Sequence, residues 1–299
     1  MSVSQLQGTL DAGKFAVTAE IGPPRSCEVD KLRQMARLLK GSAHAFNLTD
    51  NQAANVRMSS IASSVICLQE GLEPVMQMTC RDRNRIAMQS DVIGASALGI
   101  RNVLCISGDH QVFGNHPQAK NVYDLDSIQE LMVLRNLTKG NNWSGETLPE
   151  PPQLYLGAAV NPFADPFEFR VTRLGKKVDA GAQFVQTQCV LDVERFKKFM
   201  GLVVEKELHE KVHIIAGVIP LRSHKAALFM KNKVAGMSVP DELVDRLRRS
   251  SDPKEEGIRM CVEMMNELSS IKGVHGVHIT AIAWEDIIPR LVEEAGIRP

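Results

Sequence analysis

Short apolar runs rich in valine and isoleucine recur along the whole chain, and polar or glycine-containing segments separate each run from the next. Each run has the length and composition of one β-strand. The pattern predicts eight strands: Phe15–Gly22, Ala43–Asp50, Glu73–Cys80, Asn102–Gly108, Leu154–Asn161, Phe184–Leu191, His213–Pro220 and Gly276–Ala283.

Between the strand-like runs, apolar residues recur at helical spacing. Val29–Leu39 carries them on one face, and Asp192–His209 shows the same pattern. An aspartate followed by a proline is typical of a helix start, so Asp252 predicts a helix that continues to Leu268. A similar start after Pro240 predicts a helix over residues 242–249.

Strands that alternate with helices are typical of a parallel sheet with right-handed crossovers. Eight such units in 299 residues predict an α/β fold, a single (β/α)8 or TIM barrel that occupies residues 1–299. The rival doubly wound sheet normally shows a glycine-rich phosphate motif, and the sequence contains neither GxGxxG nor GxxxxGK. We interpret Thr138–Gln153 as a loop before the fifth strand, not as a domain boundary.

Charge and cysteine usage narrow the class of protein further. The 35 lysines and arginines balance 35 acidic residues, which gives no electrostatic reason to expect nucleic acid or a membrane surface as partner. No apolar run is long enough to span a bilayer, and the N-terminal segment lacks a secretory apolar core. The six cysteines form no CxxC pair, and we interpret Cys80, Cys105 and Cys189 as core residues in a reducing, cytoplasmic compartment.

Polar side chains gather at the carboxyl ends of the predicted strands, where a barrel places its active site. Buried parallel strands are normally almost wholly apolar, so this convergence predicts a polar ligand. The residues are Glu20, Asn47, Thr49, Asp50, Asn51, Gln77, Thr79, Ser107, Asp109, His110, Asn161, Gln188, Arg222, Ser223 and His224.

Several of these residues have a purely structural alternative. Glu20 lies in an apolar strand, which predicts a raised pKa suited to a proton donor, but an ion pair with Arg25 would make it structural. Asp109 is either a ligand-facing acid or a turn or helix-cap residue. Gln77 and Gln188 either face a ligand or satisfy backbone groups inside the barrel.

A basic cluster precedes the sixth strand. Arg170, Arg173, Lys176 and Lys177 lie on one predicted helix, either as a solvated face or as a clamp for an anionic group such as a ligand phosphate. No metal site is expected, because three histidines form no set with an obvious carboxylate: His44, His110 and His116.

Seven segments, taken in order, resemble the methylenetetrahydrofolate reductase family. They read "VTAEIGPPR", "NLTDNQ", "MQMTCRDRNR", "GIRNVLCISGDH", "KKVDAGAQFVQTQ", "AGVIP" and "GIRP". The resemblance runs from Phe15 to Pro299 and is to the short form that has only the catalytic domain. It implies a barrel with non-covalent FAD that reduces 5,10-methylenetetrahydrofolate to 5-methyltetrahydrofolate, with hydride passing through the flavin. It also implies a homo-oligomer.

The resemblance assigns roles residue by residue. Glu20 matches the catalytic acid, which protonates the folate imidazolidine nitrogen. Asp109 matches an acid that lies near both the flavin and the pterin, where its charge would assist binding of a cationic folate, and Gln188 matches a glutamine that hydrogen-bonds the pterin. The basic helix would hold the FAD pyrophosphate. The positions that match FAD contacts are Thr49, Gln77, Ser107, Gly108, Asp109, Arg173, Lys176 and Lys177.

The sequence departs from the family pattern at four ligand-side positions. Gln77 replaces a histidine, Ser107 replaces an arginine, and Ala283-Trp284 replaces an Asn-Arg pair. His224 aligns with the aromatic residue that packs against NADH, and we expect it to contact substrate. The electron donor therefore stays open between NAD(P)H and a partner redox protein. Two further hypotheses are a non-catalytic binding subunit and a pterin-binding methyltransferase barrel that binds no flavin.

Overall fold

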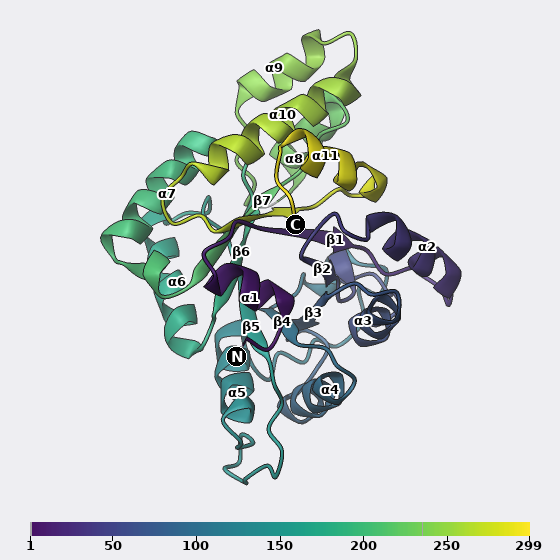
Figure 1. Ribbon diagram of the computed structural model, residues 1–299, viewed down its shortest axis with the longest axis vertical. Coiled ribbons are helices and arrows are strands. Elements are labelled where there is room, and N and C mark those ends of the chain that lie inside the picture. Colours follow the sequence, from purple (N-terminus) through teal and green to yellow (C-terminus); the bar gives the residue numbers. More distant parts are fainter. Residues whose placement is uncertain (1, 235) are drawn as a thin grey trace.

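The computed structural model describes residues 2–234 and 236–299, and these form a closed barrel of parallel strands in the order β1 to β8 (Figure 1). Each strand pairs with the next, and β8 pairs with β1. Every strand lies inside one of the eight predicted runs, which confirms the predicted fold class. The strands are β1 Ala16–Ile21, β2 Ala45–Leu48, β3 Pro74–Thr79, β4 Asn102–Ile106, β5 Tyr155–Val160, β6 Phe184–Cys189, β7 His213–Val218 and β8 Gly276–Ile279.

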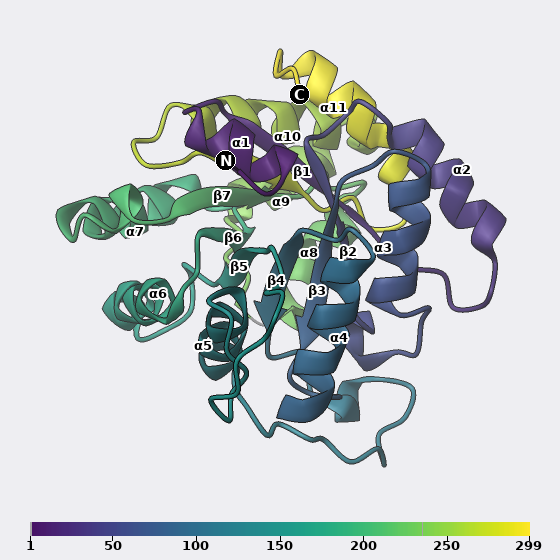
Figure 2. The ribbon, with the colours of Figure 1, turned by 60° about the horizontal axis from the view of Figure 1, so that its bottom comes forward.

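Helices surround the barrel, as Figure 2 shows for α3, α4, α5 and α6 beside their strands. The α-helices are α1 Gln5–Asp11, α2 Val29–Leu39, α3 Ser60–Gln69, α4 Arg85–Ala97, α5 Ser127–Thr138, α6 Phe167–Ala180, α7 Val193–Glu205, α8 His224–Lys233, α9 Asp241–Arg249, α10 Pro253–Ser269 and α11 Ile288–Glu294. Single 3-10 turns are η1 Gln52–Ala54, η2 Gln111–Phe113, η3 Leu208–Glu210 and η4 Glu285–Ile287.

Helix boundaries follow local chemistry. The Asp252 side chain accepts hydrogen bonds from the backbone of Lys254 and Glu255, so it caps α10 as predicted. Helix α2 has the predicted bounds. Helix α7 ends earlier than its apolar pattern predicts, because Glu207 adopts a left-handed conformation with φ of 54° and starts η3 instead. The segment between α5 and β5 is a loop, as predicted, although Thr138 still belongs to α5. A bridge between Asn141 and Thr147 closes this loop.

Helix α1 lies across the amino-terminal end of the barrel (Figure 1). Leu6 and Leu10 are buried there against an apolar layer that includes Tyr155 and Phe184. The rings of Tyr155 and Phe184 stack with centroids 5.0 Å apart. A Cβ atom at Gly157 would lie 2.2 Å from the Phe184 ring, so only glycine leaves room for it. This end of the barrel is closed by packed apolar side chains.

The next layer inside the barrel is polar, which the expectation of almost wholly apolar strands did not anticipate. Asn47 and Gln186 form a mutual pair of amide hydrogen bonds of 2.6 and 3.0 Å. Gln186 also donates to Thr18, and Thr18 lies 2.9 Å from Nδ1 of His278. Burial lowers the pKa of His278 to about 4, so this imidazole is neutral at pH 7. The four buried side chains satisfy one another.

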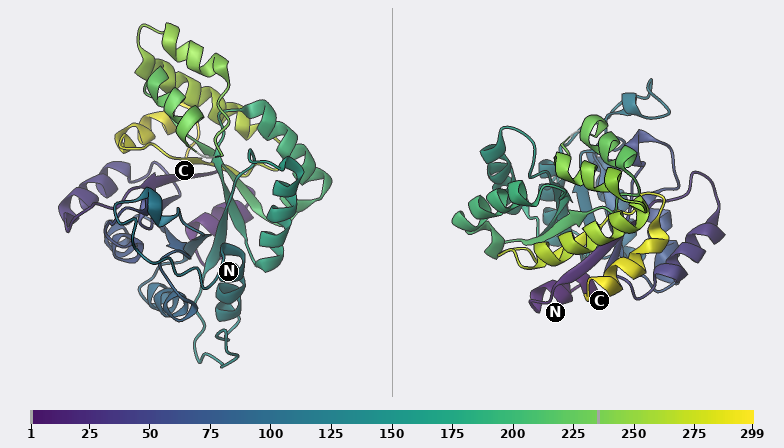
Figure 3. Two further views of the ribbon diagram at one scale, coloured as in Figure 1. Left: turned by 180° about the vertical axis from the view of Figure 1, so that it is seen from behind. Right: turned by 90° about the horizontal axis from the view of Figure 1, so that it is seen from above.

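Loops at the carboxyl end of the barrel, the end that faces the viewer in the left view of Figure 3, contact each other. The backbone N–H of Val122 donates to the carbonyl of Arg81 over 2.8 Å, which ties the long loop after β4 to the end of β3. Gly114 of the same loop lies against Ala54, where a Cβ would meet the Ala54 carbonyl at 1.8 Å. The loops after β2, β3 and β4 therefore form one unit beside the barrel mouth.

The core contains the predicted cysteines: Cys80, Cys105 and Cys189 are buried and carry free thiols. Within the described ranges, no helix combines the length and apolar character that crossing a membrane requires.

Candidate active site

One cavity of about 680 Å³ opens at the carboxyl ends of the strands. Cavities of roughly 300–1,000 Å³ are typical of small-molecule and cofactor sites. The barrel brings several of the sequence-predicted site residues together there, although they come from five strands or strand ends and one helix. Those that line the cavity are Glu20, Gln77, Ser107, Asp109, Asn161, Arg170, Arg173, Lys177 and Gln188.

Glu20 lies near the carboxyl end of β1 and faces the cavity. Burial, and after it the nearby charge of Glu285, raise its pKa to about 7. The amide of Gln52, which donates to Oε1 over 3.1 Å, and the charge of Arg57 act in the opposite direction. The salt bridges among the described residues include none between Glu20 and Arg25. Glu20 is thus a carboxyl group that holds or releases a proton near neutral pH, as its apolar strand predicts.

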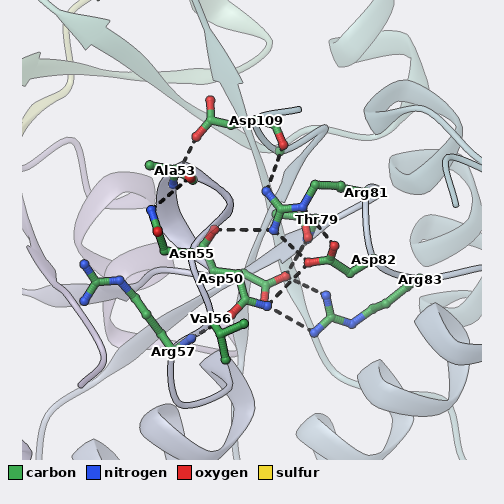
Figure 4. A network of polar contacts seen from close by, with 12 residues as sticks. Asp50, Ala53, Asn55, Val56, Arg57, Thr79, Arg81, Asp82, Arg83 and Asp109 are labelled. Carbon is green, nitrogen blue, oxygen red and sulfur yellow. Dashed lines mark hydrogen bonds and ion pairs between the residues drawn. The ribbon is translucent and has the colours of Figure 1, made fainter. Parts of the chain in front are cut away.

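Asp109 follows Gly108, whose φ of 81° places it in the left-handed region that favours glycine. The Asp109 carboxylate accepts a hydrogen bond from the backbone N–H of Ala53 over 3.1 Å. Its backbone carbonyl accepts one from Arg81 over 2.9 Å (Figure 4). The cap of η2 is His110, not Asp109. The acid is held toward the cavity by contacts from two other loops.

The two glutamines contribute differently. Gln188 lies in β6 where the pairing with β7 shifts register, an irregularity of the kind that redirects side chains. Its side-chain oxygen accepts from the Cys189 N–H over 3.0 Å, so the predicted structural alternative holds for that oxygen. Its NH2 group is then the end that can serve a ligand in the cavity. Gln77, 9% exposed, comes from β3 on the opposite side.

Helix α6 turns three of its four cationic residues toward the cavity. Arg170, Arg173 and Lys177 line it, whereas Lys176 is exposed on another face of the helix. This follows from spacing, because residues three and four apart share a helix face. Burial, with the charge of Arg173, lowers the pKa of Lys177 to about 8, and its ammonium donates to the carbonyl of Ala159.

Four of the residues to which the resemblance assigns a ligand contact do not line the cavity. Thr49 is 2% exposed with a hydroxyl that has no hydrogen-bond partner among the described residues. Gly108 contributes backbone conformation behind the lining, Lys176 points outward, and His224 is the first residue of α8. Their proposed ligand contacts stay predictions.

Sequence reasoning missed other lining residues. Gln186 and His278 form the floor, and Phe229 of α8, 58% exposed, lies at the side. A usable signal existed for the floor, because alternate residues of a strand point the same way. Gln186 stands two positions before Gln188 and therefore shares its face. No comparable signal in the sequence identifies the exposure of Phe229.

Asp50, which the sequence places at the same rim, has a structural role. Its carboxylate accepts from the Thr79 backbone and hydroxyl, each over 2.9 Å, and pairs with Arg83 over 2.5 Å (Figure 4). Asp50 is 3% exposed, and Arg83 is held on its other side by Asp91. Through these contacts Asp50 and Arg83 connect the end of β2 to β3 and α4.

The fold and the site define a class: a (β/α)8 barrel with a ligand cavity that combines a carboxyl group titrating near neutral pH, a second carboxylate and a cationic helix face. Comparison with protein families makes this specific. The family model described as methylenetetrahydrofolate reductase matches residues 5–296, and the chain belongs to that family.

Individual relatives are distant. The chain is 24% identical to a probable methylenetetrahydrofolate reductase (NADPH) of Caenorhabditis elegans, over 98% of this chain but 44% of that protein. It is 25% identical to the 5,10-methylenetetrahydrofolate reductase of Pectobacterium carotovorum, over 100% of this chain and 94% of that protein. The chain thus spans less than half of the first relative and nearly all of the second.

Among solved structures, the barrel resembles an uncharacterized protein from Clostridium thermocellum described as binding two copies of 5-methyl-5,6,7,8-tetrahydrofolic acid. The TM-score is 0.67 over 97% of both chains, with 16% sequence identity. This likeness concerns the fold.

Proposed function

We propose that this chain reduces 5,10-methylenetetrahydrofolate to 5-methyltetrahydrofolate with FAD held in the cavity. The observation that carries the proposal is the arrangement of Glu20: in a chain of this family, a carboxyl group with a pKa of about 7 faces a cavity shared with Asp109. Such a group can be protonated in the resting enzyme and still give up its proton at neutral pH.

The lining of the cavity is compatible with FAD. The cavity volume of about 680 Å³ lies within the usual range of cofactor sites, and Arg173 and Lys177 supply positive charge on one side for a pyrophosphate. When bound, FAD supplies a two-electron carrier that accepts and delivers hydride.

Glu20 would hold a proton at its carboxyl and donate it to the imidazolidine nitrogen of the folate, which opens that ring. Gln52 and Arg57 both favour the ionised form of Glu20, so they stabilise the carboxylate that donation leaves behind. The apolar surroundings that raise the pKa also keep bulk water from competing for the proton.

Asp109 and Gln188 would orient the pterin ring between them. The Asp109 carboxylate can accept hydrogen bonds from the pterin amino group, and its charge favours a cationic folate. The NH2 end of Gln188 can donate to a ring acceptor, since its oxygen is already engaged. The description of the Clostridium thermocellum protein supports a folate as ligand for a barrel of this fold.

The electron donor is either NAD(P)H or a partner redox protein. We propose the partner protein as the second candidate, because His224, which replaces the family's NADH-packing aromatic residue, begins α8 outside the cavity lining. By the same family likeness we propose that the chain is cytoplasmic. We also propose that it forms a homo-oligomer, which sedimentation velocity tests.

The test is the visible spectrum of the purified chain, followed without oxygen as NADH is added. A flavin band that bleaches supports a reductase that uses NADH directly. A flavin band that persists while a reduced dye still drives folate reduction supports a partner protein. A colourless protein that binds folate but takes up no added FAD contradicts the proposal and supports a flavin-free barrel.

A further inference from the structure

Two consecutive residues each hold one of the two acids of the site. The side-chain amide of Gln52 donates to Oε1 of Glu20 over 3.1 Å. The backbone N–H of Ala53 donates to Oδ2 of Asp109, also over 3.1 Å. All four residues line the same cavity. A single turn after β2 therefore joins an acid of β1 to an acid of the loop after β4.

This turn has an unusual backbone. Asn51, Ala53 and Ala54 have φ angles of 48°, 53° and 55°, in the left-handed region, and none of them is glycine. Such a conformation is strained for residues other than glycine and persists only where surrounding contacts impose it. The contacts that impose it here should therefore be identifiable.

Arg81 supplies the main anchor (Figure 4). Its buried guanidinium donates to the Asn51 carbonyl over 3.3 Å and to the Asp109 carbonyl over 2.9 Å. The same group pairs with Asp82 over 2.7 Å. One side chain thus fixes the backbone on both sides of the contact between Ala53 and Asp109.

We propose that the turn Asn51–Ala53 is a bridge that positions the two acids as one unit, with Gln52 as the positioning residue for Glu20 and Arg81 as the anchor. This inference rests on the proposed roles of Glu20 and Asp109. Gln52 acts by donating a hydrogen bond to the Glu20 carboxylate, and Ala53 acts by fixing the direction of the Asp109 carboxylate.

The charges around Glu20 determine how the loss of Gln52 changes the protonation of Glu20. Glu285 of η4 disfavours the ionised form, Arg57 favours it, and the Cys189 thiol of β6 also interacts with Glu20. A hydrogen bond donated to a carboxylate stabilises its ionised form. Removing the amide of Gln52 while these charges stay in place therefore shifts Glu20 toward its protonated form.

The first experiment titrates Glu20 in the full chain by carboxyl 13C NMR, with its signal assigned through Glu20→Gln. Gln52→Met keeps the side-chain length and removes the donor. We expect the pKa of Glu20 to rise by about half to one unit, the equivalent of one hydrogen bond. The matched control is Gln69→Met, because the Gln69 side chain accepts from Arg33 outside the site. An unchanged pKa in folded Gln52→Met overturns the inference.

A second variant covers a failure of Gln52→Met to fold. Gln52→Glu has nearly the same size and places a like charge beside Glu20, so it raises the pKa of Glu20 if the two side chains are neighbours. An unchanged pKa of Glu20 in this variant contradicts the proposed bridge. The titration needs no catalysis, so a chain that reduces no folate fails the proposed function while the bridge is still tested.

The role of Arg81 as the anchor is tested separately, through the KM for folate. Arg81→Lys keeps the charge but cannot reach both carbonyls with a planar fork. We expect a rise of about tenfold in the KM for folate through displacement of Asp109, with a smaller change in kcat. Near-UV circular dichroism reports whether the fold is intact. A folded Arg81→Lys variant with an unchanged KM removes Arg81 from the bridge.

Discussion

Glu20 illustrates how the burial of one carboxyl group can lower the stability of the folded chain at neutral pH. Its pKa is about 7 in the folded chain and 4.5 for an ordinary glutamate, so the folded state binds the proton more tightly than the unfolded state does. This contribution to stability is fully present below pH 4.5 and is lost as pH rises through 7.

Glutamine does not ionise, so replacement of Glu20 by glutamine removes this loss of folding stability at high pH. We expect Glu20→Gln to be more stable than the parent chain above pH 7 by about 2 kcal/mol, with the difference vanishing near pH 4. Urea denaturation at a series of pH values measures it. A variant whose advantage does not grow with pH shows that Glu20 is not held in its protonated form.

Two adjacent lysines provide a matched pair on α6. Lys177 lines the cavity, whereas Lys176 is exposed on another face. We expect Lys177→Met to weaken FAD binding by about tenfold to a hundredfold, since a charge-assisted contact is lost, and Lys176→Met to leave it nearly unchanged. Fluorescence titration with FAD measures both variants. Equal effects from the two would mean that the cavity face of α6 does not hold the pyrophosphate.

Residue roles were partly predictable from sequence. The pKa of Glu20 follows from an acid in an apolar strand, and the convergence of Asp109 and Gln188 follows from strand ends. The split between Lys176 and Lys177 depends on how α6 is rotated against the barrel, which adjacent charges in a sequence do not reveal. The exposure of Phe229 depends likewise on the packing of α8.

At the scale of elements, Asp50 joins β2 to β3 and α4 through Thr79 and Arg83. Its loss leaves the largely buried Arg83, with a side chain 12% exposed, with Asp91 as the remaining ion-pair partner among the described residues. We expect Asp50→Ala to lower the free energy of unfolding by about 3 kcal/mol. Asp124→Ala is the control, because Asp124 pairs with Arg85 at the surface, and it should change the stability far less. Comparable losses in the two variants would contradict a structural role for Asp50.

The elements themselves were the most predictable part of the molecule. Buried parallel strands produce continuous apolar runs, and each of the eight runs contains one strand. The runs extend past the strands at the carboxyl ends, where residues such as Ser107 already belong to loops. The early end of α7 and the polar layer around Gln186 depend on tertiary contacts that no local pattern records.

At the scale of the whole molecule, closure of the barrel brings the site residues together. Glu20, Asp109 and Gln188 are separated by many residues, and parallel strands in order bring their ends to one rim. Because the proposed donor must carry its proton, we expect folate reduction at saturating FAD to fall about tenfold per pH unit above pH 7. A steady-state pH profile measures this. A rate that stays flat up to pH 9 would exclude Glu20 as the proton donor.

The most direct test of the central claim bypasses the electron donor. The FAD-loaded chain is reduced chemically without oxygen, mixed rapidly with 5,10-methylenetetrahydrofolate, and followed by the return of the oxidised flavin absorbance. The account predicts rapid reoxidation in the parent chain, formation of 5-methyltetrahydrofolate, and loss of both in Glu20→Gln while FAD stays bound. Flavin that stays reduced in the parent chain, or reoxidation that is as fast in Glu20→Gln, would contradict it.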